Sequence, residues 1–372
     1  MQTRAAIAAT LGLPRKLGGQ LLDTAGQIVV ESVRRHRAFV ALVIGYWAAC
    51  YAAAWATGGL EAVDIRPYTT VFSFFVAALI VLAVLGATLY VMIVERPEGS
   101  LYPAIGQALL GRVFSADRLA SVFVPLVVSP LFFTTFGSFK RLIPLMNAYS
   151  WDHAFMTWDA WLHGGTQPWV LLQPILGTPF ATTGINFFYN FWLFLMFATF
   201  IWQACSLKRS AARMQYLLCF LLNWVVVGTV LATLLSSVGP CYYGRVTGLA
   251  DPYAPLMAYL QAANEVAPVW SLKVQEMLWD NYVSHGTMLG SGISAMPSMH
   301  MSIATLMALL GWRINRWAGA GYTAFAAVIL VGSVHLGWHY AIDGYVSVAV
   351  SIAVWQATGW VLRRWSQPAI GR

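Results

Sequence analysis

The chain has 372 residues, of which 59% are hydrophobic and 10% are charged. Soluble domains are about 45–50% apolar and about 25% charged, so this composition excludes a soluble globular protein, a disordered chain and a disulfide-stapled secreted module. The 22 lysines and arginines exceed the 14 aspartates and glutamates by eight. Such an excess indicates either a nucleic-acid binder or an orientation signal in a membrane protein, and the positions of the charges decide between them.

Eight apolar stretches reach or approach the length needed to cross a bilayer core about 30 Å thick, which takes about 20 helical residues. In chain order they cover residues 38–57, 69–94, 119–138, 186–204, 216–238, 298–312, 318–337 and 342–362. The sixth stretch is the shortest. We therefore predict an all-α integral membrane protein with about eight transmembrane helices. Residues 1–37 form a basic segment before them, either lying on the inner leaflet as a partial helix or frayed as a tail.

The distribution of lysine and arginine tests this topology. If the N-terminus lies inside and the helices alternate in direction, the segments predicted outside hold only five of the 22 basic residues, namely Arg66, Lys140, Arg141, Arg245 and Lys273. Cytoplasmic loops are enriched in lysine and arginine, and a miscounted helix would invert every later loop. The excess charge is thus an orientation signal, with both termini cytoplasmic and no nucleic-acid partner. Compact loops and the lack of a eukaryotic sorting signal favour a bacterial inner membrane.

Two long segments, residues 139–185 and 239–297, lie outside under this topology. In the first, Asp152 and Asp159 are seven residues apart and share a helix face, and Asp159 is four residues from His163 and able to pair with it. The simpler interpretation is an amphipathic surface helix with solvated acids; the alternative is that these acids shape a headgroup pocket. The second opens with residues 239–245, which either hold an anion through Arg245 or form an ordinary turn.

Histidines at the outer ends of the last helices are the strongest candidates for chemistry. His300 begins the sixth stretch, and His335, His339 and Asp343 follow one another every four residues. Ionisable groups at membrane depth are costly and are functional candidates by default. One imidazole oriented by a carboxylate attacks phosphorus while a second protonates the leaving oxygen. The same spacing also fits a metal site, or a structural polar cluster between helices.

These stretches resemble the type 2 phosphatidic acid phosphatase (PAP2) superfamily. Its second signature, Pro-Ser-x-His, is matched at residues 297–300, and the His-x-x-x-Asp that ends its third signature is matched at residues 339–343. The order along the chain also fits the family's six-helix core, which helices three to eight supply here. The resemblance implies four parts: a basic segment over 1–37, two added helices within 38–118, a catalytic domain over 119–362, and a tail over 363–372.

The departures from the superfamily pattern point to one branch. The lysine and Arg-Pro pair of the first signature are absent, and residues 239–243 occupy that position. The arginine of the third signature is also absent, because Gly332-Ser333 stands in its place. The branch related to fungal inositol phosphorylceramide synthase likewise keeps Pro-Ser-x-His and His-Tyr-x-x-Asp without the phosphatase arginines. The resemblance to this branch covers residues 119–362.

The resemblance implies a role for each matched residue. His339 is the nucleophile that forms a phosphohistidine, Asp343 orients it, and His300 is the general acid and base. With the usual arginines missing, the candidates to bind the phosphate are Arg245, Lys273, Ser298, His335 and Tyr243. This mechanism implies no metal or other cofactor, because protein cations take the place of magnesium. His335 is equally interpretable as a packed polar residue.

We therefore predict a membrane lipid phosphotransferase or phosphatase that acts at the outer face on a phospholipid or lipid-linked phosphate. The branch favours transfer of a phosphoryl headgroup, such as inositol phosphate, to a lipid hydroxyl. A plain lipid-phosphate or polyprenyl-diphosphate phosphatase is the alternative. A transporter or non-catalytic scaffold is a further alternative, against which stand the lack of an inverted repeat and the gathering of polar residues at one face. The sequence does not indicate an oligomeric state.

Overall fold

Helices make up all the regular structure of the described residues. The computed structural model describes residues 15–64, 66–207, 211–284, 286 and 292–365. The long helices are α2 (Arg15–Arg35), α3 (Arg37–Thr57), α4 (Arg66–Tyr90), α6 (Ala116–Met146), α9 (Pro179–Cys205), α10 (Ala211–Val225), α15 (Met299–Ile314), α16 (Arg316–His335) and α17 (Ala341–Trp365). The shorter helices are α5 (Leu101–Ala108), α7 (Asp152–Leu162), α8 (Pro168–Leu176), α11 (Ala232–Leu234), α12 (Tyr243–Thr247), α13 (Ala254–Val266) and α14 (Trp270–Val283). Single π-helical turns cover Val91–Glu95, Leu109–Val113 and Val226–Leu231, and 3-10 turns cover Leu60–Ala62 and Pro240–Tyr242.

The described helices include seven that are long and apolar enough to cross a membrane, and α15 is a shorter apolar helix of 16 residues. The prediction of an all-α, multi-pass integral membrane fold is therefore confirmed. The main difference lies in α6, which runs over Ala116–Met146 although the apolar pattern predicts residues 119–138. Lys140 and Arg141 end the apolar run, but neither residue type breaks a helix.

The basic N-terminal segment is helical where the structure describes it, since α2 covers Arg15–Arg35. Its last turn contacts α6: Arg35 forms an ion pair with Asp117 at 2.9 Å, and the Ser32 hydroxyl accepts a hydrogen bond from the N–H of Val124 at 3.1 Å. Residues 1–14 of this segment and residues 366–372 of the predicted tail lie outside the described residues. The contacts with α6 hold the end of α2 against the bundle.

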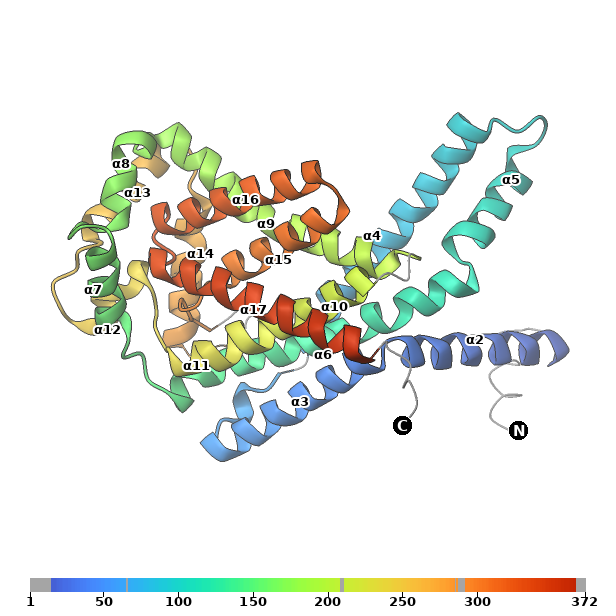
Figure 1. Cartoon of the computed structure of the whole chain (residues 1–372), viewed down its shortest axis with the longest axis horizontal. Helices are drawn as coiled ribbons and strands as arrows, with labels where there is room; N and C mark the ends of the chain where they lie inside the picture. The colour runs from blue at the N-terminus through green and yellow to red at the C-terminus, as the bar shows by residue number, and fades with distance from the viewer. Residues whose placement is uncertain (1–14, 65, 208–210, 285, 287–291, 366–372) are drawn as a thin grey trace.

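The bundle is built around α15, which packs against α10, α16 and α17. Figure 1 shows α7, α8, α12 and α13 gathered at one end of this bundle, whereas α2, α4 and α5 extend beyond it at the other. Together with α14, the short helices α7, α8, α12 and α13 are here named the cap. They belong to the two long segments between spanning helices, so those segments fold as one layer over the ends of α15, α16 and α17.

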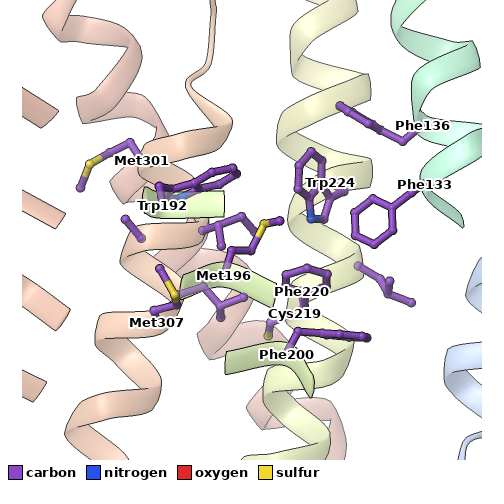
Figure 2. Packing of buried hydrophobic residues seen from close by; sticks show 14 of the residues in the cluster. Phe133, Phe136, Trp192, Met196, Phe200, Cys219, Phe220, Trp224, Met301 and Met307 are labelled. Carbon is purple, nitrogen blue, oxygen red and sulfur yellow. The ribbon is translucent and has the colours of Figure 1, made fainter. Parts of the chain in front are cut away.

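Aromatic side chains fill the bundle beneath the cap (Figure 2). Phe133 and Phe136 of α6 meet Trp224 of α10 with ring centroids 5.6 and 4.7 Å apart. Phe200 of α9 packs on Phe220 of α10 at 4.7 Å. Such offset and edge-to-face pairs add to the dispersion energy of burial, which dominates helix association in a membrane. The cluster fixes α6, α9 and α10 relative to one another.

A hydrogen-bond network inside the bundle fixes the rotation of α15. The Asn223 side chain on α10 accepts hydrogen bonds from the hydroxyls of Ser302 on α15 and Ser351 on α17, each at 2.8 Å. The bilayer core provides no water, so polar groups there pair within the protein. Ser302 lies two residues after His300, and the network therefore also sets the direction in which His300 points.

Candidate functional site

Asp159 on α7 caps the first turn of α17. Its carboxylate accepts hydrogen bonds from the backbone N–H groups of Ala341 at 2.8 Å and Ile342 at 3.0 Å. The N–H groups of a first helical turn lack partners within the helix, so a carboxylate there satisfies them and complements the helix dipole. His163 does not pair with this carboxylate; its Nδ1 contacts the backbone carbonyl of Asp159 at 2.7 Å. α7 is thus fastened directly to the helix that carries Asp343.

Asp152, two turns before Asp159 on the same face of α7, is equally buried and connects two other segments. Its carboxylate accepts hydrogen bonds from the N–H groups of Val238 and Gly239 and from the hydroxyl of Tyr340, at 2.9–3.1 Å. Burial raises the pKa of this carboxyl above its ordinary value, and the N–H donors act in the opposite direction. The interpretation of α7 as a surface helix with solvated acids is therefore wrong, because only 2% of Asp152 and 1% of Asp159 is exposed.

His339 and Asp343 form a hydrogen-bonded pair where α17 begins. The Nδ1 of His339 lies 3.1 Å from Oδ2 of Asp343, and the N–H of Tyr340 donates to the same oxygen at 3.1 Å. Asp343 is fully buried, whereas His339 lines a cavity. When Nδ1 carries the proton that it donates to Asp343, the lone pair of Nε2 is free for a reactant. This is the arrangement that a nucleophilic imidazole requires.

His300 lies in the first turn of α15 and faces the same cavity. Its ring centroid is 6.3 Å from that of His339. The ring is held between Tyr189 and Trp192 of α9, with centroids 4.4 and 4.2 Å away. Within the described residues His300 makes no hydrogen bond, so both of its ring nitrogens are available to a ligand. Stacking therefore positions the imidazole without consuming its proton-transfer capacity.

The cavity has a volume of about 480 Å³ and is lined mainly by apolar side chains. Its walls come from α6, α9, the end of α10, α14 and residues 292–300 and 338–339. The polar side chains on these walls include Lys140, Asn190, Ser271, Ser294, His300 and His339. No carboxylate lines it among the described residues. A cavity of this kind suits a ligand that is apolar over most of its length and anionic at one end.

Lys140 is the site residue that the sequence pattern does not single out. It enters the sequence argument only as one of the five outer basic residues. It lies on α6, 160 residues before His300 and outside every motif, so only the tertiary fold brings the two together. The sequence feature that could have indicated Lys140 is a basic residue just after the apolar run of a spanning helix. That feature alone does not distinguish a lysine that binds a ligand from a lysine on the surface.

Two predicted phosphate ligands lie away from the cavity walls. Arg245 pairs with Glu276 at 2.6 Å and stacks over the ring of Trp279. The hydrogen bond to Glu276 raises the pKa of the Arg245 guanidinium. The Glu276 carboxylate is also the counter-ion of this guanidinium. Lys273 on α14 is exposed and is not among the residues that line the cavity. The structure therefore does not bring either cation to the two histidines.

The other three predicted phosphate ligands have internal partners. Ser298 is fully buried and caps α15 by accepting a hydrogen bond from the N–H of Met301. The hydroxyl of Tyr243 contacts Nδ1 of His153 at 3.1 Å. His335 is buried, with its Nε2 at 2.9 Å from the Thr182 hydroxyl. None of the three lines the cavity, so each serves the framework around it.

The metal hypothesis requires His335, His339 and Asp343 to converge, and the structure separates them. His339 points its Nδ1 at Asp343, while His335 turns towards Thr182 on α9. Among the described residues no group of three His, Cys, Asp or Glu side chains is arranged to hold a metal ion. The residues at hand instead form a histidine–aspartate pair with a second histidine opposite.

These features define a multi-pass membrane protein with a histidine–histidine–aspartate site at the capped end of its bundle. The family model of the PAP2 superfamily matches residues 153–357, which is more than half of the chain, and the protein belongs to this superfamily. Its members are generally phosphatases and phosphotransferases. No curated protein and no solved structure matches the chain. The family match includes His300, His339, Asp343 and all of the cap except Asp152, but not α6.

Proposed function

We propose that the protein is a lipid phosphotransferase or lipid phosphatase that works through a phosphohistidine. The observation that carries the proposal is the shared cavity of His300 and His339, with Asp343 bonded to the far side of the His339 ring. The catalytic domain would comprise residues 119–362, because α6 supplies one wall of that cavity.

In the first step, Nε2 of His339 attacks the phosphorus of a lipid phosphate ester. The P–O bond to the leaving alcohol breaks as the N–P bond forms, and the leaving oxygen takes a proton from His300. The Asp343 carboxylate stabilises the positive charge that develops on the His339 ring, as the aspartate of a serine–histidine–aspartate triad does for its histidine. The products of this step are the phosphorylated His339 and the released alcohol.

In the second step, the hydroxyl of an acceptor attacks the same phosphorus. His300, which gave its proton to the first product, removes the proton of this hydroxyl. The N–P bond then breaks and restores His339. Water as acceptor gives a phosphatase, and a lipid alcohol gives a phosphotransferase. The largely apolar walls favour a lipid acceptor over water.

Transfer of a phosphoryl headgroup, as in the branch related to inositol phosphorylceramide synthase, is the form of the proposal that the His-Tyr-x-x-Asp sequence at 339–343 supports. In the structure the Tyr340 of this sequence bonds to Asp152, so it connects the catalytic segment to the cap. A plain lipid-phosphate or polyprenyl-diphosphate phosphatase needs the same histidines and the same aspartate. The identity of the acceptor therefore separates the two.

The test is lipid mass spectrometry of the purified protein with phosphatidic acid, phosphatidylinositol or a polyprenyl diphosphate, each with and without a lipid alcohol. A new lipid phosphate ester that forms only with the alcohol identifies a phosphotransferase; it is a phosphodiester from phosphatidylinositol and a phosphomonoester from the other two donors. Free phosphate, or inositol phosphate from phosphatidylinositol, that forms without the alcohol identifies a phosphatase. The His300→Ala variant should lose about 10²–10⁴-fold of either rate, the usual contribution of general acid–base catalysis. Turnover that is unchanged in His300→Ala would contradict the mechanism, and transport without turnover would favour a transporter.

The cap and the cavity would lie on the outer side of a bacterial inner membrane, with both termini inside. Support comes from the lysines and arginines, of which only five of 22 lie in the segments on the cap side. A reporter that is active only in the cytoplasm, fused after the end of α17, should be active. The same reporter inserted after Gly248, in the cap between α12 and α13, should be silent. The reverse pattern would contradict the assigned orientation.

A further inference from the structure

The candidate site contains one lysine side chain that the superfamily motifs of this chain do not include. We propose that Lys140 binds the phosphate of the substrate, and that the cavity thereby selects amphiphiles whose phosphate is anionic. This inference rests on the proposed function for its substrate class. The argument uses the contacts of Lys140, the packing that fixes its position, and the charges around it.

Among the residues that the structure describes, Lys140 has no counter-ion. It lines the cavity on α6, and within the described residues its ammonium group forms no hydrogen bond and no ion pair. It shares the walls of this cavity with His300. An ammonium group in apolar surroundings is strongly penalised unless it is paired. A bound anion removes that penalty. The site without a ligand therefore favours binding of an anion next to Lys140.

Backbone packing fixes the place of Lys140 relative to the histidines. Gly292 adopts φ of +92°, and a Cβ built on it would lie 2.9 Å from the carbonyl carbon and oxygen of Lys140. Only glycine allows this approach. The segment that starts at Gly292 runs along the cavity to Pro297 and then into the first turn of α15, which carries His300. Lys140 and His300 are thus joined through a short, tightly packed segment.

The charges near the cavity give it a positive character. Asp343 is buried behind the His339 ring, and no carboxylate reaches the walls among the described residues. The two cations that the sequence suggests as phosphate ligands are occupied or remote, since Arg245 is paired with Glu276 and Lys273 is exposed outside the cavity. Lysine binds phosphate as a point charge, which tolerates the change in phosphate geometry during transfer.

The experiment measures binding of inorganic phosphate separately from turnover. Trp192 and Trp338 line the cavity, so tryptophan fluorescence of the detergent-purified protein reports on its occupancy. We expect Lys140→Met to weaken phosphate binding at least about tenfold, because one charge-assisted contact is lost, and Lys140→Arg to recover most of it. In lipid assays Lys140→Met should raise KM and also lower kcat.

Two control variants and one replacement for Lys140→Met complete the experiment. Arg313→Met removes an exposed cation at the far end of α15 and should bind phosphate as the wild type does. Lys273→Met tests the competing cation and should also leave phosphate binding unchanged. Lys140→Gln replaces Lys140→Met if the latter is not recovered as monodisperse protein.

The outcomes separate this inference from the proposed function. Wild-type phosphate affinity in Lys140→Met, or a loss confined to Lys273→Met, would overturn the role of Lys140. The absence of any phosphate-dependent signal in the wild type would overturn it as well. Loss of phosphate binding in Lys140→Met together with no turnover of any lipid would support the anion site and count against the lipid phosphotransferase.

Discussion

Replacement of His339 by alanine should abolish phosphoryl transfer, with a fall in rate of at least about 10³-fold, because removal of a covalent nucleophile leaves only binding and polar stabilisation. His339 is the imidazole with a carboxylate on one nitrogen and the cavity on the other. His300 lacks such a carboxylate and is held by ring stacking instead. The proposal therefore gives the role of nucleophile to His339 and that of proton transfer to His300.

The measurement is a rapid acid- or base-quench of the protein with a radiolabelled phosphate ester. Label that survives base and is released by acid marks a phosphohistidine. We expect it in the wild type and not in His339→Ala, whereas His300→Ala should accumulate label if its loss slows the second step more than the first. Label that persists at the wild-type level in His339→Ala would show that another residue is the nucleophile. The stability of each variant in detergent is the control for folding.

Replacement of Asp152 by alanine should cost about 3 kcal/mol or more of stability, since it leaves three buried donors without an acceptor and each hydrogen bond to a charged group contributes about 1.5–3 kcal/mol. The donors are the N–H groups of Val238 and Gly239 and the hydroxyl of Tyr340. Because Tyr340 follows His339 directly, activity should fall with stability. Asp152→Asn keeps one acceptor oxygen and should lose less.

Unfolding of the purified variants in detergent, followed by the change in their melting temperature, checks this expectation. Asp280→Ala is the matched control, because Asp280 is an exposed acid on α14 of the same cap. Its removal should change stability by less than about 0.5 kcal/mol, as surface substitutions usually do. A melting temperature for Asp152→Ala equal to that of Asp280→Ala would show that the carboxylate does not hold the cap to the catalytic segment.

The sequence predicts those parts of the fold and site whose determinants are local. Apolar runs identify the spanning helices, because a bilayer requires a continuous apolar stretch from each. The pairing of His339 with Asp343 is also predicted from the sequence, because only four residues separate them, although His339 lies just before the first residue of α17. The family motifs add His300, although it is 39 residues away from His339 along the chain.

The contacts that the sequence does not predict all join distant residues. Asp152 bonds to Tyr340 across 188 residues, and Asp159 bonds to Ala341 across 182. The sequence around an acidic residue on an amphipathic helix does not show whether its carboxylate is buried against another segment or solvated. The interpretation as solvated acids was therefore wrong for both Asp152 and Asp159. For the same reason the charges of Arg245 and Lys273 suggest phosphate ligands, and the fold directs one of them to Glu276.

The bond between Asp159 and the first turn of α17 bears on how the protein is made. α7 precedes α17 by about half the chain, so during synthesis the Asp159 carboxylate has no partner at α17 until that helix has been made, whereas Asp152 meets Val238 and Gly239 earlier and Tyr340 last. Until then His339 lacks its neighbouring acid, and the cap contacts the bundle only through earlier partners, such as the bond between Tyr259 on α13 and Thr182 on α9. Under the proposed mechanism, a nascent chain therefore has no activity before α17 is in place.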